Sequence, residues 1–476
     1  MIDLSKGFSR RQFIAQTSCF GAWYAVARLI PVPALAVDLA GDSRVSQTPI
    51  VDKGFASVRK IGEGLYATIS DTSKGLTTIC NGGFLVGKDT ALLLEGFAGP
   101  AGATFQMDAL RMVSRVPVQG ALDTHYHFDH SMGNSFYGAN GLPLWAHATA
   151  AKRIVERYAP MQGADKEAVL GPFEKRVKDA KSDMERAHAQ SDLNAVTGVF
   201  QIANATVLGL PNHPLDPAKL PMTIDLGGLT ARVESYPGHS GTDMVLRAPE
   251  QNVVYTGDLL FSGWYPVCFD EKATISGWRE TLKKFAAFDK DTLFVPGHGQ
   301  ICGQEGIASI REVFDDIAGQ AEKMYKAGVP VGEAQHRYVV PDKFKNFPIY
   351  AWGFTIGPAI TKLYAEWQGK YRCSRSLEYF AAGAGHADTL IAKNLVEAVN
   401  DSAGAWRGVC ERVAAAKNRL HPRGPRCFDF LHRIGDEQKL AWPARERSCD
   451  FLVAFTFCLD SHSRIEELRD VRGQIA

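Results

Sequence analysis

One short stretch constrains this chain more than any other: residues 123–130 read Asp-Thr-His-Tyr-His-Phe-Asp-His. An apolar, strand-like run precedes it, so we expect a strand to end here and a helix to open at residues 131–133. His125 and His127 lie two positions apart, and two such imidazoles at a strand end can point the same way and share one metal ion. The stretch therefore predicts a metal site.

Further metal-ligating side chains follow, and they suggest more than one ion. The turn after His127 would let Asp129 and His130 face a second ion. Three later residues each come after an apolar run: His239 in Pro-Gly-His-Ser-Gly, Asp258 in Thr-Gly-Asp, and His298 in Pro-Gly-His-Gly. Binding residues gather at loops where strands end. We expect all these side chains to meet at one site.

Together these motifs resemble those of the metallo-β-lactamase superfamily, over roughly Ile61 to Ile317. The resemblance implies an α/β fold, an αβ/βα sandwich of two mixed sheets with outer helices. It also implies two metal ions close together. One would be held by His125, His127 and His239, and the second by Asp129, His130 and His298, with Asp258 bridging both.

The ligand set favours zinc. Nitrogen and oxygen ligands dominated by neutral imidazole suit zinc and tolerate manganese or iron. Superfamily members with two irons typically carry a carboxylate at the position of His127, so a diiron oxidoreductase is disfavoured. Two zinc ions sharing a hydroxide lower its pKa to about 7. Asp129, the expected catalytic residue, would orient that hydroxide and accept its proton during hydrolysis of a small acyl substrate.

The substrate stays open at this stage. Hydrolases of β-lactams typically carry Cys or Ser near the position of Asp258, often with a Lys just after it, whereas Leu-Leu-Phe-Ser follows here. The stretch that contains Asp258 instead resembles the corresponding stretch of thioesterases and lactonases of the glyoxalase II type. A β-lactamase-like amide or ester substrate is narrowly preferred, because the protein is expected to be exported. The alternatives are a thioesterase or lactonase, an exported hydrolase linked to quinoprotein pathways, and a non-catalytic accessory protein.

Composition excludes several other classes of protein. Lys and Arg number 53 against 52 Asp and Glu, and a formal net charge of +1 does not provide the basic surface that nucleic-acid binding needs. Nine cysteines in 476 residues are too few for a disulfide scaffold. After the N-terminal segment there is no run of about 18 apolar residues, so we expect no membrane span in the mature chain.

The N-terminal segment is expected to be an export signal. Arg10 and Arg11 precede a mostly apolar stretch, in the manner of a twin-arginine signal. Ala-Leu-Ala at residues 34–36 offers a small-residue cleavage site, so the mature chain would begin near Val37. We expect residues 1–36 to be read by the twin-arginine export machinery, which would deliver the folded protein to the periplasm.

The remaining organisation follows from apolar periodicity and breaker residues. We expect a linker over 37–58, a catalytic domain over 59–328 with a helical insertion at about 150–222, an extension of that body over 329–371, and an appended segment of unknown role over 372–476. Short strands are expected over 65–69, 77–79, 83–86 and 91–94, and a helix over 103–114.

Two further features of the sequence each allow two interpretations. Apolar residues recur at steps of four and three over 173–187, which predicts an amphipathic helix that begins at Gly171-Pro172. That helix either packs on the body or serves as a lid. Tyr350, Trp352 and Phe354 form an aromatic group that either docks a terminal helix or closes the pocket.

Overall fold

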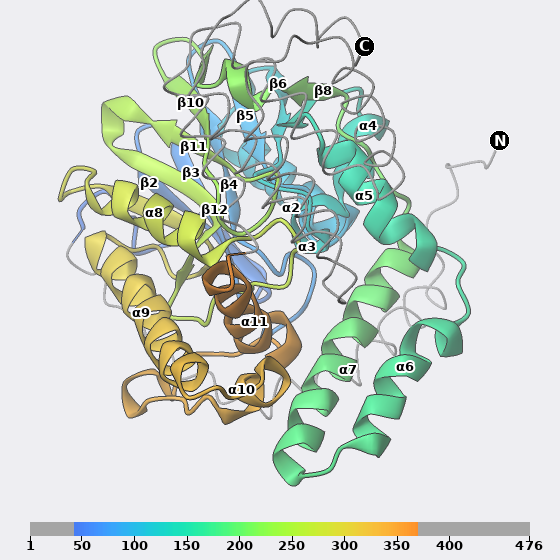
Figure 1. The fold of residues 1–476 in the computed structure, drawn as a ribbon. Coiled ribbons are helices and arrows are strands. Elements are labelled where there is room, and N and C mark those ends of the chain that lie inside the picture. Colours follow the sequence, from blue (N-terminus) through green and yellow to red (C-terminus); the bar gives the residue numbers. More distant parts are fainter. Residues whose placement is uncertain (1–41, 370–476) are drawn as a thin grey trace, which may run out of the picture. The chain divides into compact units, whose positions relative to one another are not determined.

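The computed structural model describes residues 42–369, and within them two mixed sheets form the centre of the molecule (Figure 1). The expected signal peptide and the expected appended segment 372–476 lie outside the described residues. The first sheet has its strands in chain order, antiparallel from β1 to β5 and parallel from β5 to β8. These strands are β1 Val51–Asp52, β2 Ala56–Gly62, β3 Leu65–Ser70, β4 Gly82–Val86, β5 Ala91–Leu94, β6 Val118–Leu122, β7 Leu144–His147 and β8 His213–Leu215.

The second sheet has the order β13-β12-β11-β10-β9, with β12 and β13 parallel and the other neighbours antiparallel. Its strands are β9 Met222–Asp225, β10 Thr230–Ser235, β11 Met244–Ala248, β12 Val253–Ser262 and β13 Leu293–Gly299. All ten residues of β12 are buried, which places this strand in the interior of the fold.

The main core lies between the two sheets, and β5 shows why. Side chains alternate between the faces of a strand. Leu92 and Leu94 join the cluster between the sheets, whereas Ala91 and Leu93 join the cluster on the outer face of the first sheet. A strand that is apolar on both sides must be covered on both sides, so helices are required outside.

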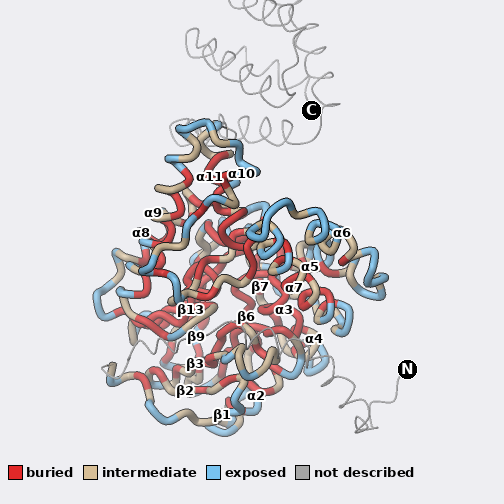
Figure 2. Tube along the Cα trace, turned by 90° about the horizontal axis from the view of Figure 1, so that it is seen from below, coloured by how far each residue is buried: buried red, intermediate tan, exposed pale blue. Residues whose placement is uncertain are grey.

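Helices cover both outer faces, which completes the expected αβ/βα sandwich. α2 (Pro100–Val113) and α4 (Asn134–Ala139) supply the outer cover of the first sheet. α8 (Ile275–Ala286) and α9 (Gln304–Lys326) lie together along the second sheet (Figure 1). There the rings of Trp278 and Phe314 are 5.0 Å apart. The central strands β4, β5, β11 and β12 are almost entirely buried, whereas the edge strands β1, β8 and β9 are not, and α6 carries a long exposed surface (Figure 2).

The remaining elements are short or peripheral. They are α3 Phe128–Ser131, α5 Ala150–Tyr158, η2 Ala159–Met161, α6 Lys166–Asp179, α7 Asp183–Ala205, η3 Pro217–Lys219, η4 Pro249–Gln251, α10 Val331–Arg337, η5 Asp342–Phe344, η6 Trp352–Phe354 and α11 Ile356–Trp367. In the described part of the chain, no helix combines the length and apolar character needed to cross a membrane.

The single helix expected over 173–187 is wrong, because two helices meet there. α6 and α7 form a hairpin whose chain turns between Asp179 and Asp183. The Ser182 side chain accepts a hydrogen bond from the Glu185 backbone at 3.1 Å and so caps α7. Apolar spacing runs through this turn unchanged, so periodicity alone could not reveal it. Pro172, the expected start, lies inside α6.

Other expectations differ from the structure at their boundaries. The strand expected over 77–79 is a turn, and Ile79 has a left-handed φ of 66°. Within the expected linker, β1 and the start of β2 pair with each other, and Val45 is buried in the core. The helix expected to open at residues 131–133 begins at Phe128.

The core between the sheets should dominate the stability of this body. Leu246 on β11 is fully buried there. We expect Leu246→Ala to lower the free energy of unfolding by about 2–5 kcal/mol, because the substitution removes apolar contacts and leaves a cavity. Val339→Ala, at a side chain that is 70% exposed, should change it by about 0.5 kcal/mol or less. Denaturant unfolding measures both, and equal losses would contradict this placement of Leu246.

Candidate metal centre

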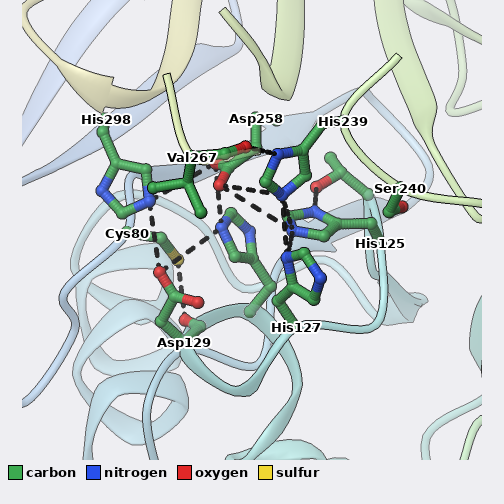
Figure 3. A network of polar contacts seen from close by, with 12 residues as sticks. Cys80, His125, His127, Asp129, His239, Ser240, Asp258, Val267 and His298 are labelled. Carbon is green, nitrogen blue, oxygen red and sulfur yellow. Dashed lines mark hydrogen bonds and ion pairs between the residues drawn. The ribbon is translucent and has the colours of Figure 1, made fainter. Parts of the chain in front are cut away.

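Seven side chains expected from the sequence meet where the two sheets come together. His125 and His127 lie in the loop after β6, and Asp129 and His130 lie on α3. His239 lies in the loop between β10 and β11, Asp258 within β12, and His298 near the end of β13. Their ligating atoms form two groups, each with its atoms within 4.8 Å of one another. Figure 3 shows the two groups side by side.

The expectation that each ligand follows the end of a strand is wrong for Asp258. Its strand continues to Ser262, and the pairing of β12 with β13 is irregular on both sides of Gly257, which has a φ of 51°. A bulge of this kind re-aims a side chain without ending the strand. It is local backbone geometry that brings the carboxylate to the site.

The first group consists of three imidazole nitrogens that point at one place. His127 Nδ1 is 3.0 Å from His125 Nε2 and 2.8 Å from His239 Nε2, and the latter two atoms are 3.2 Å apart. Nitrogens at 2.0–2.1 Å from a tetrahedral zinc would be about 3.3 Å apart, so the three positions fit a shared ion.

The second group lies beside the first, and Asp258 stands between them (Figure 3). His298 Nε2 is 3.2 Å from Asp129 Oδ2. Asp258 Oδ1 is 3.1 Å from His130 Nε2 and 3.4 Å from His298 Nε2. The other oxygen, Asp258 Oδ2, is 3.4 Å from His239 Nε2 in the first group. Each carboxylate oxygen therefore faces a different group.

Burial makes these polar side chains costly without a bound ion. Both ring nitrogens of His130 and the Oδ1 atom of Asp258 are buried and make no hydrogen bond. A buried polar atom without a partner costs roughly 1–3 kcal/mol. Bound metal ions would satisfy His130 Nε2 and Asp258 Oδ1, while Glu95 lies 3.3 Å from His130 Nδ1, so the residues present fit a dimetal site. The most exposed side chains among the seven are His298 at 11% and Asp129 at 9%, which puts the opening on their side.

The histidines of the two groups differ in their protonation state. Burial lowers the pKa of His239 to about 3 and holds that of His125 well below its usual value, so both rings are neutral and have free lone pairs. Burial also disfavours the charged form of His298, but Asp258 and Asp129 outweigh it and raise its pKa to about 9. An ion binding at the second group must displace that proton.

Asp270, which the sequence analysis missed, orients one of the ligands. It lies in the loop between β12 and α8, fully buried, with Oδ2 3.3 Å from His127 Nε2. His127 presents its other nitrogen, Nδ1, to the first group. A carboxylate that holds one ring N–H fixes the tautomer and leaves the other nitrogen free to bind metal. Burial opposes the charge of Asp270, but His127 and Tyr126 outweigh it and lower its pKa.

Several donors hold Asp270 in turn. The Tyr126 hydroxyl donates to Oδ2 at 2.5 Å, and Arg153 Nη2 donates to the same atom at 3.2 Å. The backbone N–H of Lys272 donates to Oδ1 at 2.7 Å. From α11, the buried Lys362 Nζ donates to the Asp270 backbone carbonyl at 2.6 Å. The orientation of His127 thus depends on four separate parts of the chain.

A second buried carboxylate supports the other group. Glu95 accepts hydrogen bonds from the hydroxyl and the N–H of Thr124 and has Oε2 3.3 Å from His130 Nδ1. Cys80 donates to the Asp129 carbonyl at 2.9 Å. Glu95 directly follows an apolar run, the same signal that marked the ligands, and could have been found from it. Asp270 also follows apolar residues, Tyr-Pro-Val-Cys-Phe at 265–269, but these form an irregular loop rather than a strand.

Comparisons with known proteins agree with this picture. Residues 76–298 match the family model of the metallo-beta-lactamase superfamily. This part of the chain is therefore similar to that superfamily, and the expected fold of two mixed sheets with outer helices is confirmed. Among curated proteins, none matches the chain.

Solved structures with a similar fold are distant in sequence. A metallo-beta-lactamase from Pontibacter korlensis is 16% identical over 55% of this chain and 99% of that chain, with a TM-score of 0.40. The stereoselective inverting sec-alkylsulfatase Pisa1 from Pseudomonas sp. is 14% identical over 81% of this chain and 69% of that chain, with a TM-score of 0.46.

Replacing the carboxylate of Asp270 should weaken metal binding. Asp270→Asn keeps the shape of the side chain but removes the charged acceptor of the His127 N–H. We expect the zinc affinity to fall about 10–100-fold, as measured by competition with a chromophoric chelator. Asp183→Asn, at a fully exposed carboxylate on α7, is the matched control and should bind zinc normally. Unchanged affinity in Asp270→Asn would contradict the orienting role.

The backbone beside Asp258 leaves no room for a side chain. A Cβ on Gly297 would lie 1.9 Å from Asp258 Oδ1, so this carboxylate would have to move. We expect Gly297→Ala to lower zinc affinity about tenfold or more. Gly319→Ala on α9, where an added Cβ has no neighbour within 4 Å, should leave it unchanged. Equal affinities in the same chelator competition would show that Asp258 is not held as described.

Proposed function

We propose that the protein is an exported hydrolase that binds two zinc ions at this centre and cleaves an amide or ester bond of a small acyl substrate. The observation that carries the proposal is the position of Asp258, whose two oxygens face the two groups of ligands 3.1–3.4 Å from the nearest imidazole nitrogens. One carboxylate shared in this way keeps two ions close enough to act on one bond.

The ligands would divide between the ions as the resemblance implies. His125, His127 and His239 hold one, and Asp129, His130 and His298 hold the other. Zinc ions bound there would supply an activated water as nucleophile and polarise the acyl carbonyl. The neutral state of His125 and His239 supports this assignment, because only an unprotonated ring nitrogen can bind a metal.

Asp129 is the residue we assign to proton transfer. Burial opposes its ionisation, but His130 and His298 outweigh that effect and lower the pKa of its carboxyl. At neutral pH Asp129 is therefore a proton acceptor, and its side chain lies at the more exposed side of the centre. It would accept the proton of the attacking water and pass it to the leaving group.

Two substrate classes remain in the proposal. A β-lactam-like amide or ester comes first, from the export signal that Arg10 and Arg11 suggest. A thioester or lactone is the second candidate, because the stretch that contains Asp258 resembles that of thioesterases and lactonases of the glyoxalase II type. Leu259, Leu260 and Phe261 follow it in the buried strand, so this stretch offers no lysine for a substrate carboxylate.

The first test measures metal content and turnover together. The zinc-loaded chain should hold two zinc ions and hydrolyse a carbapenem, a cephalosporin, a lactone or a thioester with kcat/KM of about 10⁴ M⁻¹s⁻¹ or more. A chelator should abolish this activity. Bound iron with a visible absorption band would point to an oxidoreductase, and metal without turnover on any of these substrates would point to an accessory protein.

Two substitutions separate metal binding from proton transfer. His127→Ala should lose metal and activity together, because it removes a ligand of the first group. Asp129→Asn should retain some metal yet lower kcat about 10²–10⁴-fold, because the amide cannot accept a proton. Asp183→Asn, at a fully exposed side chain on α7, is the matched control. Full activity in Asp129→Asn would remove its proposed proton role.

A further inference from the structure

Tyr350 is a tyrosine beside the metal centre whose hydroxyl has no partner in the described part of the chain. Its side chain is half-buried, and its oxygen makes no hydrogen bond yet is accessible to solvent. Nearby tyrosines differ: the hydroxyls of Tyr126, Tyr137 and Tyr265 all have partners. A tyrosine hydroxyl that reaches solvent and has no partner in the protein is available to a ligand, while its ring supplies apolar contact area.

The segment that carries Tyr350 is held firmly against the site. The Pro348 carbonyl accepts a hydrogen bond from the Tyr265 N–H at 3.0 Å, and the Phe354 carbonyl accepts one from the Cys268 N–H at 2.6 Å. Between these two residues of the loop lies Val267, whose carbonyl is 2.9 Å from His239 Nδ1. The position of Tyr350 is therefore tied to the loop that supports a metal ligand.

The far side of this segment is anchored to the helical hairpin. Trp352 stacks on His188 of α7 with ring centroids 3.7 Å apart, and the Gly353 N–H donates to Asp192 at 2.6 Å. Phe354 packs into the apolar cluster between the hairpin helices. The aromatic group noted in the sequence contacts α7 rather than a terminal helix, through Trp352, and approaches His127 through Phe354 and Phe269.

Aromatic rings lead from Tyr350 to the first group of ligands. Tyr350 and Phe354 have centroids 5.8 Å apart, Phe354 and Phe269 are 4.9 Å apart, and Phe269 stacks on His127 at 4.9 Å. We call Phe269, Phe354 and Tyr350 the aromatic wall. All three are half-buried, so each keeps some surface for a ligand.

Tyr350 also lies within the field of the second group. Burial raises the pKa of its phenol, and the charge of Asp129 raises it further. The phenol therefore stays protonated and acts as a hydrogen-bond donor. This donor is therefore close enough for the charge of Asp129 to act on it.

We propose that Tyr350 contacts the substrate: its hydroxyl donates a hydrogen bond to an oxygen of the acyl group bound at the metal centre, and the aromatic wall receives an aromatic or large apolar group beside that acyl group. This inference rests on the proposed function and narrows its substrate class. It assigns the segment after α10 to substrate recognition.

The test uses a binding measurement that does not depend on turnover. Benzylphosphonate carries tetrahedral, anionic oxygens and an aromatic ring, and methylphosphonate carries the oxygens alone. Calorimetric titration of the zinc-loaded full chain should show benzylphosphonate binding about tenfold more tightly than methylphosphonate. The reason is that the aromatic wall would bury the apolar surface of the benzyl ring. Tyr350→Phe should weaken both probes about tenfold or more, since the bond lost is to a charged oxygen.

Two further variants complete the design. Tyr66→Phe removes the hydroxyl of a half-buried tyrosine on β3 that stacks on Phe84, and it should bind both probes as the wild type does. Phe354→Leu should reduce the preference for benzylphosphonate while methylphosphonate affinity is unchanged. It keeps the inference testable if Tyr350→Phe does not fold, which thermal unfolding would reveal.

The outcomes separate this inference from the proposed function. Wild-type affinities in Tyr350→Phe, an unchanged probe preference in Phe354→Leu, or no binding by the wild type would each overturn the inference. If the probes bind and the variants weaken them as expected, but no acyl substrate is hydrolysed, the contact stands and the proposed function fails.

Discussion

The carboxylate of Asp258 is the feature on which the rest of the centre depends. It is buried between two sets of imidazoles, in a place where an isolated charge would be prohibitively costly. Positive charge must therefore reach it, from protonated histidines or from bound metal ions. The surrounding backbone is shaped for this carboxylate: β12 is irregular at Gly257, and Gly297 leaves it the space that a side chain would fill. The two sheets meet where these requirements coincide.

The ligands are held by side chains that are distant in the sequence. Asp270 fixes His127 and depends on donors from the loop after β6, from α5 and from α11. Glu95, directly after β5, has a carboxylate oxygen 3.3 Å from His130 Nδ1. A carboxylate that holds one nitrogen of a ligating imidazole fixes the orientation of the ring. The metal centre is thus a property of the whole sandwich, and of the C-terminal helix that packs on it.

The α6–α7 hairpin and the segment after α10 meet beside the first group of ligands. The α6–α7 hairpin makes a cluster with Phe354, and Phe354 lies against Phe269 beside His127. The hairpin therefore supports one wall of the centre from behind. A substitution on the hairpin could change substrate preference through Phe354 without touching a ligand.

Much of the centre could be predicted from the sequence, because ligand chemistry leaves short local patterns. The stretch from His125 to His130, and the glycine-flanked His239, Asp258 and His298, contain all seven side chains whose ligating atoms the structure brings together. The alternating sheets and helices were also foreseeable from apolar runs. Tertiary structure decided the rest. The turn at Ser182 interrupts an unbroken apolar period, Asp270 follows an apolar run that forms an irregular loop, and Tyr350 lies in the segment beyond α10. Periodicity records which face of an element is buried, but not which distant segment covers it. Contacts between remote segments depend on how whole layers pack, and no local pattern encodes that.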